Sequence, residues 1–177
     1  MARLFSALIP PEDALDELSA TVDAVTSPAG VGIRRFAREQ WHITLAFYGE
    51  DDPGRRAGWL RPRVAGRHAP RLRLAGGGSF PGVCWAGVSV DGYAGTLTEL
   101  AKAAGADRRF YPHLTVARYR IRPPRTPAAT VRPLRAALSA HSGRWFTPTD
   151  VVLVRSDPSS TGHRYTVVER IPLRACS

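Results

Sequence analysis

This sequence of 177 residues has two cysteines, one lysine and no long apolar run. Two cysteines are too few for a disulfide framework, and neither Cys84 nor Cys176 has a metal-type spacing. No apolar stretch approaches the roughly 18–20 residues that span a bilayer, and the segment before Pro10 is too short for a signal peptide. We therefore expect a cytoplasmic protein, associated with no membrane, in which Cys84 is a core residue.

The scarcity of lysine means that arginine carries almost all of the positive charge. Lys102 is the single lysine, and the formal net charge is +10. Arginine binds phosphate in a bidentate manner and stacks on bases, which lysine does poorly. The charge therefore favours a nucleic acid or another phosphorylated partner. Composition alone equally allows a surface on which arginine merely replaces lysine.

Two stretches, 41–50 and 112–119, share the pattern histidine, any residue, threonine, aliphatic residue. Both are rich in β-branched and aromatic residues, which is typical of a strand. Because side chains alternate along a strand, His42 and Thr44 would share one face of the first. His113 and Thr115 would share one face of the second. The motifs lie 71 residues apart, and each precedes a loop and a candidate helix, so they form a weak internal repeat.

The rest of the chain alternates between groups of expected strands and expected helices. Strands are predicted at 3–9, 31–36, 71–75, 83–90, 146–154 and 165–172, and helices at 12 to about 27, 55–65, 93–105 and 128–139. Pro62 should interrupt the second helix, and turns are expected at 76–79 and 156–162. This grouping favours an α+β fold with helices packed on antiparallel sheets. The repeat predicts a single domain over 1–177, built from two pseudosymmetric lobes that each contribute one motif to a central cleft.

Paired histidines suit acid–base chemistry, because the imidazole pKa of about 6.5 allows proton transfer near neutrality. On opposite sides of one phosphorus, one histidine takes a proton from the attacking oxygen and the other protonates the leaving oxygen. A threonine two residues further on can donate a hydrogen bond to a non-bridging phosphate oxygen. This chemistry needs no metal and no cofactor. The simplest substrate is a ribose 2′,3′-cyclic phosphate, whose strained ring opens readily.

Simpler interpretations compete with this site. A single histidine–x–threonine in a strand is usually structural, and the second copy is what favours a catalytic pair. Zinc usually takes three or four ligands, and none of the other histidines (His68, His141 and His163) has a ligand-like spacing. These three are most simply surface residues, although His163 could approach a phosphate. The glycines at 76–78 precede no Gly-Lys-Ser/Thr and no capped helix, so no phosphate-binding loop is expected there.

The paired motifs resemble those of the two-histidine (2H) phosphoesterase superfamily. Within it, the chain is similar to the bacterial and archaeal RNA 2′,3′-cyclic phosphodiesterase family, also called 2′–5′ RNA ligase. The resemblance runs nearly end to end, through the stretches 3–10, 41–50, 77–81, 83–88, 111–118, 154–156 and 162–167. It implies a bilobal fold of two antiparallel sheets, with helices outside and a basic cleft between the lobes.

The resemblance also implies roles for individual residues. His42 would be the proton donor and His113 the proton acceptor that activates water. Thr44 and Thr115 would hold the phosphate, Arg118 would reinforce them, and Tyr111 would border the nucleobase. Strict alternation places Arg118 on the face opposite His113. Only a bulge, or a twist at the end of the strand, would bring it to the site.

The expected function is hydrolysis of RNA that ends in a 2′,3′-cyclic phosphate, or of a related nucleotide, to a 2′-phosphate by a monomeric enzyme. Three alternatives stay open. The same cleft could join a 5′-hydroxyl RNA end to the cyclic phosphate through a 2′–5′ linkage. It could act on small cyclic nucleotides or on 3′–5′ bonds. It could also hold RNA ends without turnover.

Overall fold

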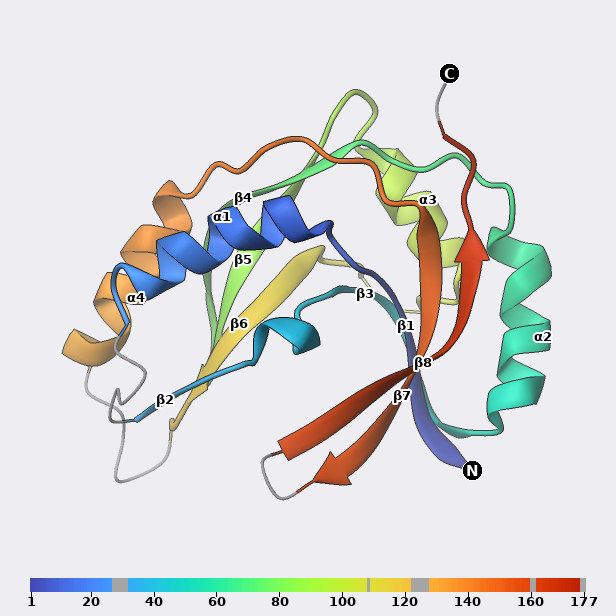
Figure 1. Cartoon of the computed structure of the whole chain (residues 1–177), viewed down its shortest axis with the longest axis horizontal. Coiled ribbons are helices and arrows are strands. Elements are labelled where there is room, and N and C mark those ends of the chain that lie inside the picture. The colour runs from blue at the N-terminus through green and yellow to red at the C-terminus, as the bar shows by residue number, and fades with distance from the viewer. Residues whose placement is uncertain (27–31, 108, 122–127, 160–161, 176–177) are drawn as a thin grey trace.

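The computed structural model of the chain describes residues 1–26, 32–107, 109–121, 128–159 and 162–175. Within these residues the α-helices lie on the outer side of a curled antiparallel sheet (Figure 1). The helices are α1 (Glu12–Asp23), η1 (Arg38–Gln40, a 3-10 turn), α2 (Pro53–Val64), α3 (Gly95–Ala103) and α4 (Ala128–Ala140). The strands are β1 (Ala2–Leu8), β2 (Ile33–Arg35), β3 (Ile43–Asp51), β4 (Leu72–Phe80), β5 (Val83–Val90), β6 (His113–Tyr119), β7 (Asp150–Ser159) and β8 (Gly162–Pro172).

The strand order β4-β5-β6-β3-β1-β7-β8 divides the sheet into two halves, with β2 added to β6. The halves meet where β3 pairs with β6, and one residue pair, Ile43 with Leu114, makes this connection. The predicted α+β class is confirmed. The two expected sheets are the halves of one hydrogen-bonded sheet, and each half carries one histidine–x–threonine strand.

The core lies between the sheet and the helices. Each of the four α-helices turns leucine or valine toward the sheet at helical spacing, and these side chains are almost fully buried: Leu18, Val22, Leu60, Val64, Leu97, Leu100, Leu134 and Leu138. Each contributes about 1.5–3 kcal/mol of burial free energy. Cys84 is a buried free thiol in this core, as predicted. No helix in the described part of the chain is long and apolar enough to cross a membrane.

Several predicted element boundaries are wrong, including that of the strand expected from 146, which begins at Asp150. Three of the errors have a local reason. α2 continues through Pro62, because the carbonyl that loses its helical donor belongs to exposed Gly58, where water can reach it. The predicted turn at 76–79 is part of β4, which comes so close to its neighbours that a Cβ on Gly77 would lie 2.6 Å from the Trp85 carbonyl oxygen. Most of the predicted turn at 156–162 is strand. Pro158 fits there because β1 does not extend beside it.

Candidate active site

A pocket of about 200 Å³ lies where the two histidine–x–threonine strands meet. Its walls include five of the six residues expected at the site: His42, Thr44, His113, Thr115 and Arg118. None of the described residues that line the pocket is acidic. The structure therefore brings the two motifs together in a pocket suited to an anion.

The meeting of the two halves of the sheet sets the geometry of the pocket. Ile43 and Leu114, the central residues of the two motifs, face each other in the antiparallel pair and are fully buried. Continuing this register by one residue in each direction sets Thr44 beside His113, and His42 beside Thr115. The two histidines therefore lie diagonally across the strand pair, each with the other motif's threonine as its neighbour.

Both imidazoles are oriented in the same way by the backbone two residues before them. Nδ1 of His42 lies 2.6 Å from the Gln40 carbonyl oxygen, and Nδ1 of His113 lies 2.7 Å from the Tyr111 carbonyl oxygen. A carbonyl only accepts hydrogen bonds, so each Nδ1 carries a proton and donates it. In the neutral ring, Nε2 is then a lone-pair acceptor on the opposite side. The two strands thus present two imidazoles in matching tautomers.

A β-bulge in each motif strand follows the threonine by one residue. In β6, Ala117 faces Cys84 and Thr115 faces the next residue of β5, Trp85, so Val116 is the extra residue. In β3, Leu45 is the extra residue in the pairing with β1. A bulge shifts the alternation of side chains. Arg118 is thereby carried to the face of His113 and Thr115, and it lines the pocket with them.

The same shift in β3 turns Phe47 toward the pocket, so the strict alternation that predicts Phe47 on the opposite face, with Ile43 and Leu45, is wrong here. Phe47 follows Thr44 by three residues, as Arg118 follows Thr115, and both line the pocket. Its side chain is 76% exposed. Phe47 also borders an adjoining pocket of about 460 Å³, with Phe80 and Tyr111 on its walls. Tyr111 therefore lies next to the pocket of the two motifs rather than in it.

The rings of Phe5 and Tyr165 pack against the imidazole of His42. The ring centroid of Phe5 is 4.7 Å from that of His42, and Tyr165 packs edge-on at 5.3 Å. Burial lowers the pKa of His42 to about 4, and the charge of His113 acts in the same direction. The hydrogen bond to the Gln40 carbonyl acts against this shift. Without a ligand, His42 is therefore neutral at pH 7.

This pKa predicts how stability changes with pH. Because the folded-state pKa of His42 is below the ordinary value, the unfolded chain binds more protons, and the stabilisation is complete only above about pH 6.5. It is lost as the pH falls toward 4, by up to roughly 3 kcal/mol. Burial also lowers the pKa of His141. His42→Asn should therefore remove only part of the loss of stability at low pH. Urea unfolding at pH 4.5 and pH 7 measures the free energy of unfolding of wild type and His42→Asn. An equal change with pH in the two proteins would contradict the prediction.

Among the remaining histidines, one differs from the sequence prediction. His68 is exposed, as expected. His141 is only 9% exposed, so its assignment to the surface is wrong; its Nδ1 lies 2.9 Å from the Thr21 hydroxyl of α1. His163 is exposed, as expected, and lines the pocket between the two motif strands. Its place on the hairpin facing β3 depends on long-range pairing, which no local pattern reveals. Among the described residues, no group of three His, Cys, Asp or Glu side chains forms a possible metal site.

Comparison with known proteins gives consistent matches. The model of the family "LigT like Phosphoesterase" matches residues 8–85. The "RNA 2′,3′-cyclic phosphodiesterase" of Thermus thermophilus is 31% identical over 193 aligned positions, covering 97% of this chain and 90% of that protein. The protein of the same name from Geobacillus stearothermophilus is 34% identical over 151 residues, which cover 76% of this chain but only 46% of that protein's length.

Solved structures match over nearly the whole chain. The crystal structure of TT0787 from Thermus thermophilus has a TM-score of 0.73 at 29% identity and covers 98% of both chains. Apo LigT of E. coli has a TM-score of 0.72 at 23% identity over 97% of both chains, a likeness of fold. The strand and helix arrangement described above is therefore shared with solved phosphoesterases.

Proposed function

The chain belongs to the LigT-like phosphoesterases, a family of the 2H superfamily, and from this and the pocket we propose that it is an RNA 2′,3′-cyclic phosphodiesterase. The observation that carries the proposal is the matched pair of imidazoles. Each donates its Nδ1 proton to a backbone carbonyl and has Nε2 on the opposite side, at one pocket where none of the described lining residues is acidic. The substrate would be RNA that ends in a 2′,3′-cyclic phosphate, and the product a 2′-phosphate.

In the proposed reaction, water attacks phosphorus and the bond from phosphorus to the ribose 3′-oxygen breaks. Nε2 of His113 takes a proton from the water as its oxygen bonds to phosphorus. His42 donates a proton from Nε2 to the departing 3′-oxygen, which leaves a 3′-hydroxyl and a 2′-phosphate. Thr44, Thr115 and Arg118 hold the non-bridging oxygens while negative charge builds on them. The order of donor and acceptor follows the family resemblance.

The low pKa of His42 must be reconciled with its role as the acid. A neutral imidazole has no proton to give from Nε2, and burial keeps His42 neutral in the empty pocket. A phosphate bound between the two rings brings a negative charge next to His42, and a nearby opposite charge favours the protonated form. We propose that substrate binding therefore raises the pKa of His42 and creates the acid at the moment when it is needed.

The division of the sheet supports a proposal for domain organisation. Each half supplies one motif strand that carries a histidine, a threonine and a bulge after the threonine, and Ile43 and Leu114 join the halves. We propose that residues 1–177 form a single domain of two pseudosymmetric lobes with the reaction at their junction. Neither lobe would be active alone.

The proposed function is tested by product analysis. A short RNA that ends in a 2′,3′-cyclic phosphate is incubated with the protein in EDTA, and the ends are identified by mass and by resistance to a 3′-specific phosphatase. We expect complete conversion to a 2′-phosphate. A second RNA with a 5′-hydroxyl, added in excess, reveals any 2′–5′ ligation in the same reaction. Absence of any opened phosphate would contradict the proposal.

A further inference from the structure

A third histidine, His163, faces the catalytic pocket from the start of β8. Side chains alternate along this strand, so His163 and Tyr165 point into the pocket, and both line it. Nδ1 of His163 lies 3.1 Å from the hydroxyl of Ser156, which is 8% exposed and belongs to the paired strand β7. The imidazole is thus oriented by its own hairpin. The proposed hydrolysis gives His163 no part.

Gln40 holds this hairpin against the segment that orients His42. Its side-chain nitrogen donates to the His163 carbonyl oxygen at 2.6 Å, and its own carbonyl accepts from His42 Nδ1. The amide orientation of Gln40 is settled by a second bond, since its side-chain oxygen accepts from the Ala37 amide. His163 therefore has a fixed position relative to the reacting phosphate.

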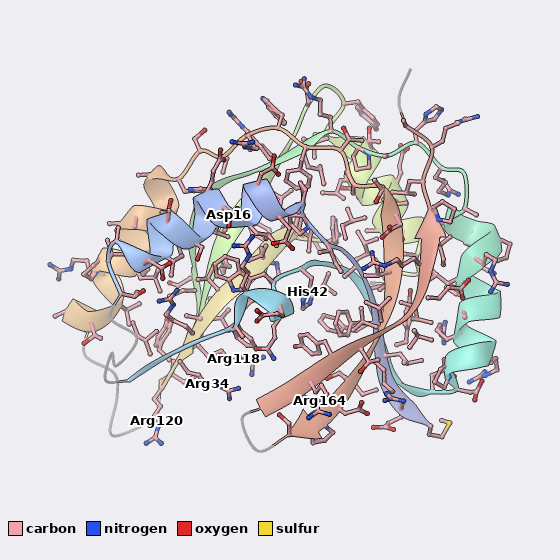
Figure 2. All side chains as sticks on the ribbon, in the orientation of Figure 1. Asp16, Arg34, His42, Arg118, Arg120 and Arg164 are labelled. Atoms are coloured by element: carbon pink, nitrogen blue, oxygen red, sulfur yellow. The ribbon has the colours of Figure 1, made fainter. Side chains whose placement is uncertain are left out.

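Two arginines meet the same end of the pocket. Arg34 of β2 faces Arg118 of β6 across the strand pair, and the Arg34 guanidinium packs on Gly162 of the hairpin. Burial raises the pKa of the Tyr165 hydroxyl, and the positive charges of Arg118 and Arg34 act against this shift. In Figure 2, Arg118, Arg34 and Arg120 follow one another away from His42 toward the end of β6. Tyr165 also packs edge-on against His42, so Arg118 and Arg34 lie near the end of the pocket that contains His42.

The pocket and its continuation hold more arginine and histidine side chains than one phosphate requires. A cyclic phosphodiester carries a single negative charge, and the two catalytic imidazoles with Arg118 already surround it. His163 and Arg34 lie further along the cleft, and no described acidic residue lines either of the two adjoining pockets that they border. Adjacent phosphates of an RNA strand are one nucleotide apart, which suits a second anion here.

We propose that His163 and Arg34 form a binding site for a second phosphate of the substrate, the 5′-phosphate of the terminal nucleotide. This inference rests on the proposed function for the identity of the first phosphate. The site would make the enzyme favour an RNA end over a lone nucleoside cyclic phosphate. It supplies charge-assisted hydrogen bonds to a group that does not react.

The site is tested by binding, so that the readout does not depend on turnover. Calorimetry compares the affinity of the full chain for adenosine 2′-monophosphate and for adenosine 2′,5′-bisphosphate. We expect the bisphosphate to bind at least about tenfold more tightly than the monophosphate, and this affinity ratio should decrease as the salt concentration is raised. His163→Gln and Arg34→Gln should each reduce this ratio to about threefold or less.

Arg164→Gln is the matched control. Arg164 is exposed on the same hairpin but alternates to the face opposite His163, and Figure 2 shows it on the hairpin. Arg164→Gln also removes one positive charge, but it should leave the affinity ratio of bisphosphate to monophosphate unchanged. A wild-type ratio near one would overturn the inference, as would equal reductions in Arg164→Gln and His163→Gln. If the ratio behaves as expected but no cyclic phosphate is opened, the second phosphate site stands and the proposed hydrolase function fails.

Discussion

Replacing His113 by alanine is expected to lower kcat on a 2′,3′-cyclic phosphate RNA end by about 10³-fold, with a much smaller change in KM. The reason is that Nε2 of His113 would take the proton from water only as the new bond forms, so its loss acts on the transition state more than on binding. His42→Ala should cause a loss of similar size. Single-turnover kinetics with enzyme in excess measure the chemical step directly.

His68→Ala serves as the control for these two variants. His68 is exposed, lies outside the pocket of the two motifs, and has its Nε2 within hydrogen-bond distance of the Arg174 guanidinium. Its replacement should change kcat by less than about twofold. Thermal unfolding of all three variants would show that the fold is retained. A loss of less than about tenfold in both His113→Ala and His42→Ala would remove the two imidazoles from the proposed mechanism.

The threonine pair gives the second large effect. Thr44→Val and Thr115→Val keep the shape of each side chain and remove its hydroxyl, so each should lower kcat by about 10²-fold on the same substrate. The two hydroxyls would hold charge that grows on the same phosphate, so the double variant should lose less than the product of the single losses. Steady-state kinetics on the four proteins complete the double-mutant cycle.

Replacing each threonine by serine separates the effect of the hydroxyl from the effect of side-chain shape. Thr44→Ser and Thr115→Ser should retain most of the activity, because both keep a donor at the same atom. Thr149→Val, at an exposed position outside the pocket, should retain full activity. If valine and serine were equally harmful at Thr44 and Thr115, packing rather than hydrogen bonding to phosphate would explain their importance.

Local pattern was enough to predict where the site would form. A strand of β-branched and aromatic residues places His42 and Thr44 on one face whatever the tertiary structure is, and the second copy does the same. The sheet then needs only to set the two strands together. Pairing of Ile43 with Leu114 achieves this through two fully buried aliphatic residues, and both belong to the repeated pattern itself.

The parts of the site that the sequence did not predict depend on pairing with other strands. Strict alternation placed Arg118 on the wrong face, and only the register of β5 against β6 shows that Val116 is bulged. Phe47 reaches the pocket through the matching bulge in β3. The Gln40 side chain donates a hydrogen bond to the backbone carbonyl of His163, although the two residues are 123 positions apart in the sequence. Such contacts follow from the curl of the whole sheet, which a local pattern does not contain.

The most direct measurement of the central claim uses a 2′,3′-cyclic phosphate whose 3′-oxygen is replaced by sulfur. A thiol has a pKa of about 8.5, so a thiolate leaves without taking a proton, and a general acid becomes unnecessary. On this substrate we predict that His42→Ala approaches the wild-type rate, while His113→Ala keeps its full defect. Equal defects in both variants would contradict a separate acid and base. Rescue of His113→Ala instead would reverse the two roles.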